Sequence, residues 1–175
     1  MKNINNIFLI GLMGSGKTTI GKLLSKKLNK LFFDSDYVIE ERLGVRVPMI
    51  FEYEGEEGFR DRESKVLNDL VLKENIVLAT GGGIILSPKN RELLSSRGIV
   101  IYLKSDYQNL AKRMVNDKTR PLLQNGDIEL TFKNLFKARD SLYSSIADYE
   151  VDTNNKSIYQ VEKKIRLFIE NYENN

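Results

Sequence analysis

A glycine-rich segment directly after an apolar run is the feature that most constrains the fold of this 175-residue chain. Residues 11–18 read Gly-Leu-Met-Gly-Ser-Gly-Lys-Thr, a complete G-x-x-x-x-G-K-[ST] phosphate loop, and the run before it is residues 7–10. Glycines let the backbone amides of such a loop turn toward one point, where they bind a polyphosphate. Because the motif joins a strand to a helix, we expect a strand at 7–10 and a helix at about 17–28.

Two side chains of the loop have chemistry of their own. Lys17 adds a mobile positive charge beside the phosphates, and the Thr18 hydroxyl can reach a magnesium ion. The helix that begins at Lys17 points the positive end of its dipole at the same place. The loop therefore predicts a nucleotide site.

Short apolar runs alternate with helical patterns along the rest of the chain. This alternation favours an α/β fold in which helices cover both faces of a parallel sheet. The expected strands are residues 7–10, 31–33, 76–79, 99–103 and, more weakly, 149–151. Ser105 with Gln108, and Ser157 with Gln160, predict capping boxes at the start of two further helices.

Two segments interrupt this alternation. Residues 36–59 contain Pro48, Gly55 and Gly58 and predict a small helical insertion over the strand ends. Residues 118–127 are polar and rich in turn formers, which indicates a lid that closes to exclude water.

Composition excludes several kinds of site. The chain has 0 Cys and 0 His, so it has no disulfide, no cysteine nucleophile, no histidine base and no Cys/His zinc site. Proton transfer must fall to Asp, Glu, Lys or Tyr. The net charge of +3 from 27 basic and 24 acidic residues does not indicate nucleic-acid binding. No apolar run approaches the roughly 20 residues of a membrane span, and we expect a cytoplasmic location.

Two carboxylates and three glycines follow expected strands. Asp34 and Asp36 lie at the end of the second strand, where parallel sheets bind ligands, and their spacing lets both face one crevice. One could hold magnesium or its water shell while the other accepts a hydroxyl proton, although either could instead cap the helix expected near Tyr37. Residues 81–83 are Gly-Gly-Gly after the third strand, which predicts a small ligand against bare backbone or a flexible turn.

Three arginines are candidate ligands for a carboxylate or a phosphate. The forked guanidinium makes two parallel hydrogen bonds to such groups, although a single arginine is more often a surface charge. Arg60 has Glu63 one helical turn later to hold it, Arg120 lies in the expected lid, and Arg139 lies in the helix after the lid.

In this order, the motifs resemble those of the shikimate kinase family over nearly the whole chain. The residues that carry the resemblance are 11–18, Asp34-Ser35-Asp36, residues 55–60 with Glu63, 81–83, Arg120-Pro-Leu-Leu123, and Arg139 with Tyr143 ahead of Ala147-Asp148. Many nucleotide-binding proteins share the first motif, whereas the ordered set is specific to the family.

The resemblance implies the fold and the reaction. The fold would be a three-layer P-loop kinase, similar to nucleoside monophosphate kinases, with a five-stranded parallel sheet of order 2-3-1-4-5. The reaction would be Mg²⁺-dependent transfer of the ATP γ-phosphate to the 3-hydroxyl of shikimate, a step of chorismate and aromatic amino acid biosynthesis. We expect one domain over residues 1–175, with a substrate-binding insertion at about 36–62 and a lid at about 114–127.

The resemblance also implies a role for each site residue. ATP would be bound by Gly14, Ser15, Gly16, Lys17, Thr18, Thr19, Arg113 and Arg120, with Arg113 against adenine. Shikimate would be bound by Asp36, Arg60, Gly82 and Arg139. Asp36 would hold ring hydroxyls and act as the base, and the two arginines would hold the carboxylate. Thr18 would ligate magnesium and Asp34 would support its water shell. Lys17, Asp36 and Arg120 are thus the expected catalytic residues.

Other functions remain open at this point. The chain could phosphorylate another small hydroxylated acceptor, such as gluconate or a nucleoside monophosphate. A regulatory switch that hydrolyses GTP would need an Asn-Lys-x-Asp signature, but Asn155-Lys156-Ser157 is followed by Ile158. A non-enzymatic nucleic-acid binder has only dispersed Lys and Arg to support it. We expect a monomer that binds ATP and a small-molecule substrate, with neither nucleic acid nor membrane as partner.

Overall fold

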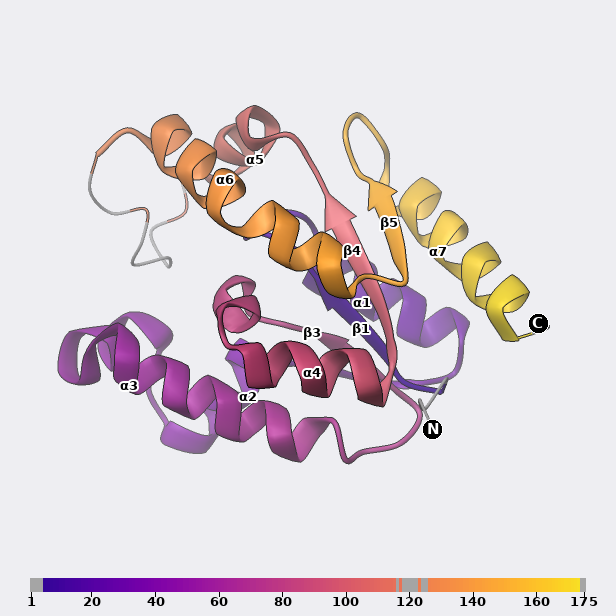
Figure 1. Cartoon of the computed structure of the whole chain (residues 1–175), viewed down its shortest axis with the longest axis horizontal. Helices are drawn as coiled ribbons and strands as arrows, with labels where there is room; N and C mark the ends of the chain where they lie inside the picture. Colours follow the sequence, from indigo (N-terminus) through magenta and orange to yellow (C-terminus); the bar gives the residue numbers. More distant parts are fainter. Residues whose placement is uncertain (1–4, 116, 118–122, 124–125, 174–175) are drawn as a thin grey trace.

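The computed structural model describes residues 5–115, 117, 123 and 126–173. Within these residues, five strands form one parallel sheet of order β2-β3-β1-β4-β5, which confirms the expected fold (Figure 1). The strands are β1 (Ile7–Ile10), β2 (Leu31–Asp34), β3 (Ile76–Ala79), β4 (Ile99–Lys104) and β5 (Tyr149–Asp152). The switch in strand order lies between β1 and β3, so the loops that follow these two strands open side by side.

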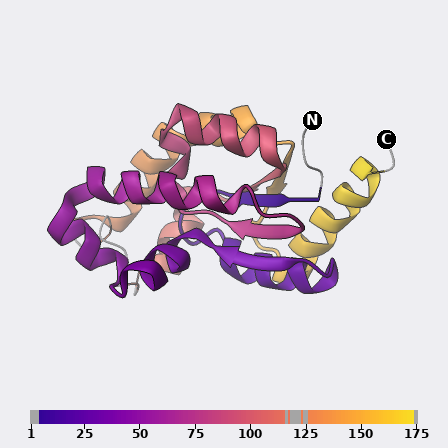
Figure 2. The same ribbon diagram turned by 90° about the horizontal axis from the view of Figure 1, so that it is seen from below.

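Helices cover both faces of the sheet and produce three layers (Figure 2). The α-helices are α1 (Lys17–Lys27), α2 (Ser35–Leu43), α3 (Val47–Leu70), α4 (Pro88–Arg97), α5 (Tyr107–Met114), α6 (Ile128–Ile146) and α7 (Ile158–Glu173), and the 3₁₀-helix η1 is Gly82–Leu86. Of the described residues, no helix is sufficiently long and apolar to cross a membrane.

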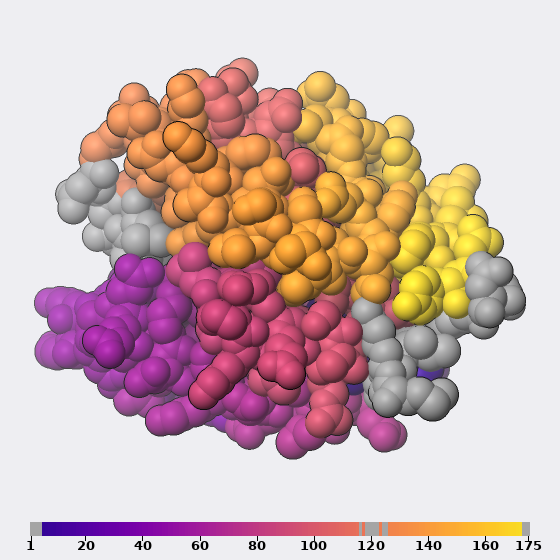
Figure 3. All heavy atoms as spheres, in the orientation of Figure 1, coloured from indigo at the N-terminus to yellow at the C-terminus, as the bar shows by residue number. Residues whose placement is uncertain are grey.

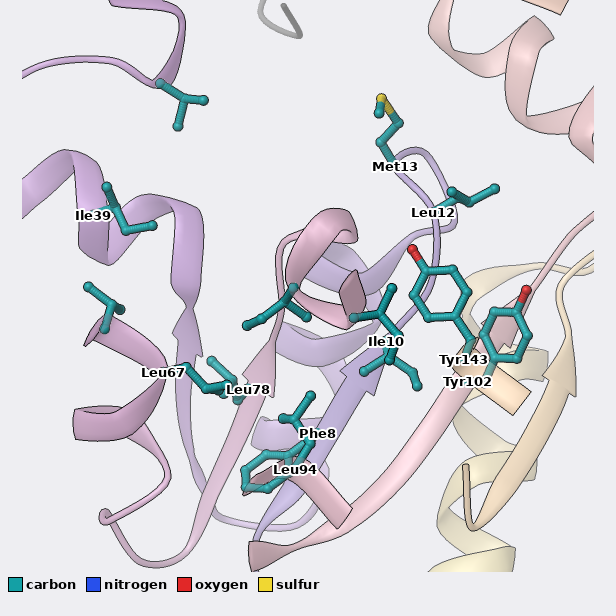
Figure 4. Close-up of a cluster of buried hydrophobic side chains, with 14 of the residues drawn as sticks. Phe8, Ile10, Leu12, Met13, Ile39, Leu67, Leu78, Leu94, Tyr102 and Tyr143 are labelled. Atoms are coloured by element: carbon teal, nitrogen blue, oxygen red, sulfur yellow. The ribbon is translucent and has the colours of Figure 1, made fainter. Parts of the chain in front are cut away.

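Alternating side chains of the central strands build two separate cores. Ile7 and Leu9 of β1 pack with residues of α1 and α7, whereas Phe8 and Ile10 pack with residues of α3, α4 and α6 (Figure 4). Both sets are fully buried because helices cover both faces of the central strands. The face covered by α4 and α6 is the one seen in Figure 3.

The residues of the expected insertion, 36–62, fall in α2 and the first part of α3, and Figure 1 shows α3 and the start of α6 on the same side of the molecule. Inside α3, Gly55 has φ 70° and ψ −178°, so the segment is two helices that meet at a kink. Few residues other than glycine adopt this backbone conformation, which accounts for the glycine at this position. The second of the two helices carries Arg60 and Glu63 toward the sheet.

One of the two expected capping boxes is present. Ser157 N donates to Gln160 Oε1 at 2.8 Å, and Gln160 N donates to Ser157 Oγ at 3.2 Å. The prediction for Ser105 was wrong, because α5 begins at Tyr107 after Asp106. The Ser105 hydroxyl donates instead to Asn154 Oδ1 at 2.8 Å, so a partner far along the chain replaces the local cap.

Candidate active site

The phosphate loop leads from β1 into α1, as its sequence predicts. Gly14 and Gly16 have φ values of 80° and 95°, in the left-handed region that glycine tolerates. The side chain of Ser15 is buried beneath the loop, whereas Thr18 and Thr19 are exposed at the first turn of α1. A cavity of about 210 Å³ lies over this turn and is lined by Gly14, Gly16, Lys17, Thr18 and Thr19, among others.

Lys17 curls back over the loop. Its ammonium group Nζ donates to the carbonyl oxygens of Gly11 at 2.7 Å and Leu12 at 2.9 Å. The side chain is only 8% exposed, so the charge is held at the cavity rather than in bulk solvent. A phosphate in the cavity would therefore meet a positive charge that is already near its place.

Asp34 links the start of α1 to the start of α2 through its two carboxylate oxygens. Oδ2 accepts a hydrogen bond of 2.6 Å from the Thr18 hydroxyl. Oδ1 accepts from the backbone N–H groups of Asp36 and Tyr37 at 3.1 and 3.2 Å, and so caps α2. Asp34 is thus the helix cap that the sequence left open, and its second oxygen is also bonded to the threonine expected to ligate magnesium.

Arg113 lies behind the phosphate loop, in α5. Its guanidinium donates to the Gly14 carbonyl at 3.1 Å and to the Thr153 carbonyl at 3.5 Å, and the residue is not among those that line the 210 Å³ cavity. It therefore holds the loop against the segment that follows β5. Arg120 lies outside the described residues, as does most of the expected lid.

Four predicted acceptor residues meet in a second cavity, of about 50 Å³. Asp36 comes from the first turn of α2, Arg60 from α3, Gly82 from η1 and Arg139 from α6. The sequence separation between them shows that the fold, and not a local motif, assembles this cluster. Its other lining residues are Met13, Val47, Phe51, Phe59, Glu63, Gly81 and Gly83.

A buried acid holds Arg60 in this cavity. Arg60 Nη1 donates to Glu63 Oε2 at 2.9 Å, and Nη2 donates to Glu56 Oε1 at 3.2 Å. The Glu63 side chain is 1% exposed. Burial raises its pKa to about 7 against the lowering effect of Arg60, while Asp36 raises the pKa further and Arg139 lowers it. The acceptor cavity thus combines two arginines with carboxylates that partly balance them.

The glycine triplet leaves room for these charged groups. A Cβ atom on Gly83 would overlap the Arg60 guanidinium, and one on Gly81 would lie 2.5 Å from Glu63 Oε1. At these two positions the bare backbone accommodates the chain's own side chains, where the sequence had left open a small ligand or a flexible turn. A Cβ atom on Gly82 would meet nothing closer than 3.5 Å, and this residue faces the cavity.

The two cavities are adjacent and share part of their walls. Met13, Asp36, Gly81 and Gly82 line both of them, so a group bound over the phosphate loop and a group bound beside Arg60 would meet at Asp36. A larger cavity of about 860 Å³ runs along the edge strand β2 and includes Asp34 and Asp36 in its wall, but Arg60, Arg139 and Lys17 do not line it. The convergence of charged groups, and not cavity size, identifies the site.

Sequence reasoning missed the apolar wall and one polar contact. Val47, Phe51 and Phe59 line the acceptor cavity, but their sequence pattern is that of an ordinary core-facing helix. Ser35, which is fully buried, accepts a hydrogen bond of 2.9 Å from Gly81 N and so fixes the glycine segment against α2. The position of Ser35 between two predicted site residues, Asp34 and Asp36, was the one sequence signal that could have indicated this contact.

Comparisons with known proteins agree on one family. A family model described as "Shikimate kinase" matches residues 13–170. The chain is 53% identical over 165 residues to a shikimate kinase of Methylococcus capsulatus, which covers 94% of this chain and 92% of the relative. A shikimate kinase of Burkholderia lata is 50% identical over 153 residues, or 87% of this chain and 83% of the relative.

Solved structures give the same result. The shikimate kinase from Acinetobacter baumannii, in complex with shikimate, matches with a TM-score of 0.93 and 45% identity over 97% of this chain and 96% of that one. A gluconokinase from Sinorhizobium meliloti matches with a TM-score of 0.63 at 14% identity, over 99% of this chain and 98% of that one. This second likeness shows a shared fold alone.

Proposed function

Because the chain belongs to the shikimate kinase family, we propose that it transfers the γ-phosphate of ATP to the 3-hydroxyl of shikimate and releases ADP and shikimate 3-phosphate. The observation that carries this proposal is the wall that the two cavities share at Asp36 and Gly82. It supports a direct transfer, in which the phosphoryl donor and the acceptor hydroxyl lie side by side. The product belongs to aromatic amino acid biosynthesis, as for the family.

The acceptor cavity suits a small hydroxylated carboxylate. Arg60 and Arg139 bind the carboxylate, because two guanidinium groups beside a single small cavity favour an anion with paired oxygens. Asp36 accepts hydrogen bonds from ring hydroxyls at the end nearest the phosphate loop. This orientation places the alcohol, rather than the carboxylate, next to the transferred phosphate.

Transfer itself is a displacement at phosphorus. The bond between the γ-phosphorus and the oxygen that bridges to the β-phosphate breaks, and a bond forms from the same phosphorus to the acceptor oxygen. The hydroxyl proton passes to Asp36 and then to solvent. Lys17 and the loop amides stabilise the negative charge on the phosphoryl oxygens and the leaving ADP, which is the larger contribution in a loose transition state. Arg120 is proposed to add a charge from the lid.

The oxygen atoms beside the phosphate loop fit a magnesium ion. Mg²⁺ is usually held by one or two protein oxygen ligands together with water and substrate phosphates, so a dedicated protein cage is not needed. The Thr18 hydroxyl and Asp34 Oδ2, which are 2.6 Å apart, provide such hard oxygen ligands. When bound, the ion would neutralise charge on the phosphates. The described residues contain no group of three acidic side chains that could hold a metal by themselves.

A coupled ADP-release assay tests the function. We expect ADP release that requires shikimate and magnesium, and none above background with gluconate or nucleoside monophosphates as acceptor. Activity on one of those compounds without activity on shikimate would contradict the proposal.

Arg60→Ala tests the acceptor site, with Arg62→Ala as the matched control. Arg62 lies two residues along the same helix but pairs with Glu54 at the surface and does not line the cavity. Loss of a charge-assisted hydrogen bond costs about 1.5–3 kcal/mol, so Arg60→Ala should raise the KM for shikimate by about ten- to a hundredfold and leave the KM for ATP unchanged. Equal increases in both KM values, or an equal effect of Arg62→Ala, would contradict the role.

The cytoplasmic location, the monomeric state and the single-domain organisation stay predictions.

A further inference from the structure

Tyr143 lies in α6, one helical turn after Arg139, and is completely buried. Its hydroxyl donates a hydrogen bond of 2.6 Å to the carbonyl oxygen of Gly82. Its ring stacks on that of Tyr102, with centroids 4.9 Å apart and planes 29° apart. Figure 4 shows the two rings side by side, near the phosphate-loop residues Leu12 and Met13.

This hydrogen bond joins the glycine triplet to helix α6, and both contribute residues to the wall of the acceptor cavity. Gly82 is the central residue of a glycine triplet, which has little conformational preference of its own. Arg139 lies on a 19-residue helix with a packed apolar face. The short bond from Tyr143 therefore holds a permissive backbone segment against a rigid helix, and both contribute to one cavity.

The hydroxyl keeps its proton throughout the working range of pH. Burial raises the pKa of Tyr143 well above its ordinary value, and the positive charge of Arg139 opposes the rise without cancelling it. Tyr143 is thus a permanent donor to the Gly82 carbonyl and has no proton to exchange with the substrate.

We propose that Tyr143 is a positioning residue for the acceptor, whose hydroxyl fixes the Gly82 carbonyl relative to Arg139 and so sets the width of the shikimate-binding cavity. The inference rests on the proposed function. Gly82 lines both the acceptor cavity and the cavity over the phosphate loop, so a shift of this segment would change the boundary between them.

Tyr102 provides a matched control. It is 1% exposed and belongs to the same ring stack, but its hydroxyl donates to Asp140 Oδ1 at 2.9 Å. Asp140 pairs in turn with Lys104 at 3.1 Å, away from the acceptor cavity. The two tyrosines thus differ in where their hydroxyl groups bond, while ring size and burial are similar.

The test compares Tyr143→Phe and Tyr102→Phe in steady-state kinetics and in calorimetric titration with shikimate. Each change removes one oxygen atom and keeps the ring, at a cost of about 1–3 kcal/mol, which a domain of ordinary stability survives. We expect Tyr143→Phe to raise the KM and the dissociation constant for shikimate about tenfold, with kcat and the KM for ATP within about twofold of wild type. Tyr102→Phe should leave all of these constants within about twofold of wild type. Both variants should lower the melting temperature by similar amounts, because each loses one buried hydrogen bond.

The outcomes separate this inference from the proposed function. Wild-type protein that releases no ADP with shikimate would refute the proposed function itself. Active wild-type protein together with an unchanged shikimate KM in Tyr143→Phe would refute only the positioning role. Equal increases in the shikimate KM for the two variants would also refute it, because they would assign the effect to the ring stack.

Discussion

The substitution Glu63→Gln tests whether burial outweighs ion pairing at the centre of the acceptor cavity. Glu63 pairs with Arg60 at 2.9 Å, and its side chain is 1% exposed. Burial raises the pKa of its carboxyl from 4.5 to about 7, against the charge of Arg60. In the folded protein, Glu63 therefore keeps its proton to a higher pH than in the unfolded chain.

The sign and size of the effect follow from proton linkage. Between pH 4.5 and about 7 the folded state binds more protons than the unfolded state, so the free energy of unfolding falls as the pH rises through this window. At about 1.4 kcal/mol per pKa unit, the whole shift corresponds to about 3 kcal/mol. Roughly 2–3 kcal/mol of this falls between about pH 5 and pH 8.

Urea unfolding of wild type and Glu63→Gln across this pH range measures the effect. Titrating groups that do not interact with Glu63 contribute equally in both proteins, so the difference between the two free energies reports on Glu63 and its charged neighbours. We expect this difference to shift by roughly 2–3 kcal/mol in favour of Glu63→Gln from about pH 5 to pH 8. Glu56→Gln, which removes the more exposed partner of Arg60, should show no such shift. Parallel profiles for wild type and Glu63→Gln would refute the reasoning, and a shift in the opposite direction would show that Arg60 keeps Glu63 ionised.

Two further substitutions separate the two cavities. Lys17→Ala should abolish ADP release but leave the far-UV circular dichroism spectrum unchanged, because Lys17 carries the charge beside the phosphates and donates hydrogen bonds to Gly11, Leu12 and Ser15 of its own loop; near-normal turnover would rule that role out. Gly83→Ala should raise the KM for shikimate by at least about tenfold with little change in the KM for ATP, because the added methyl group would displace the Arg60 guanidinium. An unchanged KM for shikimate would mean that the guanidinium can move without loss.

The fold was predictable because its strongest signals are local. Residues 11–18 form a complete phosphate loop, and the buried strands read as short apolar runs. The order of the strands came instead from the family resemblance, since periodicity does not specify which strands pair. The failed cap at Ser105 shows the limit of local reasoning, because its hydroxyl bonds to Asn154 in a distant connection.

The site was predictable as a set of residue types but not as an arrangement. Asp36, Arg60 and Arg139 stood out by charge and context, and the fold brings them to one cavity. The sequence did not reveal that the Arg60 guanidinium occupies the space beside Gly83, because that contact joins two helices that are separate in the chain. Tyr143 belonged to the family motif, but its bond to Gly82 required the packing of α6 on η1.

The double duty of Asp34 has a consequence for how variants of this enzyme should be interpreted. One carboxylate oxygen touches the threonine proposed for the metal, and the other anchors the first turn of the helix that carries Asp36. A substitution at Asp34 should therefore change the affinity for the metal and the affinity for the acceptor together. A variant of Asp34 that binds both the metal and the acceptor more weakly would have lost one shared contact, and not two separate ones. A new acceptor preference would have to arise from substitutions at other positions.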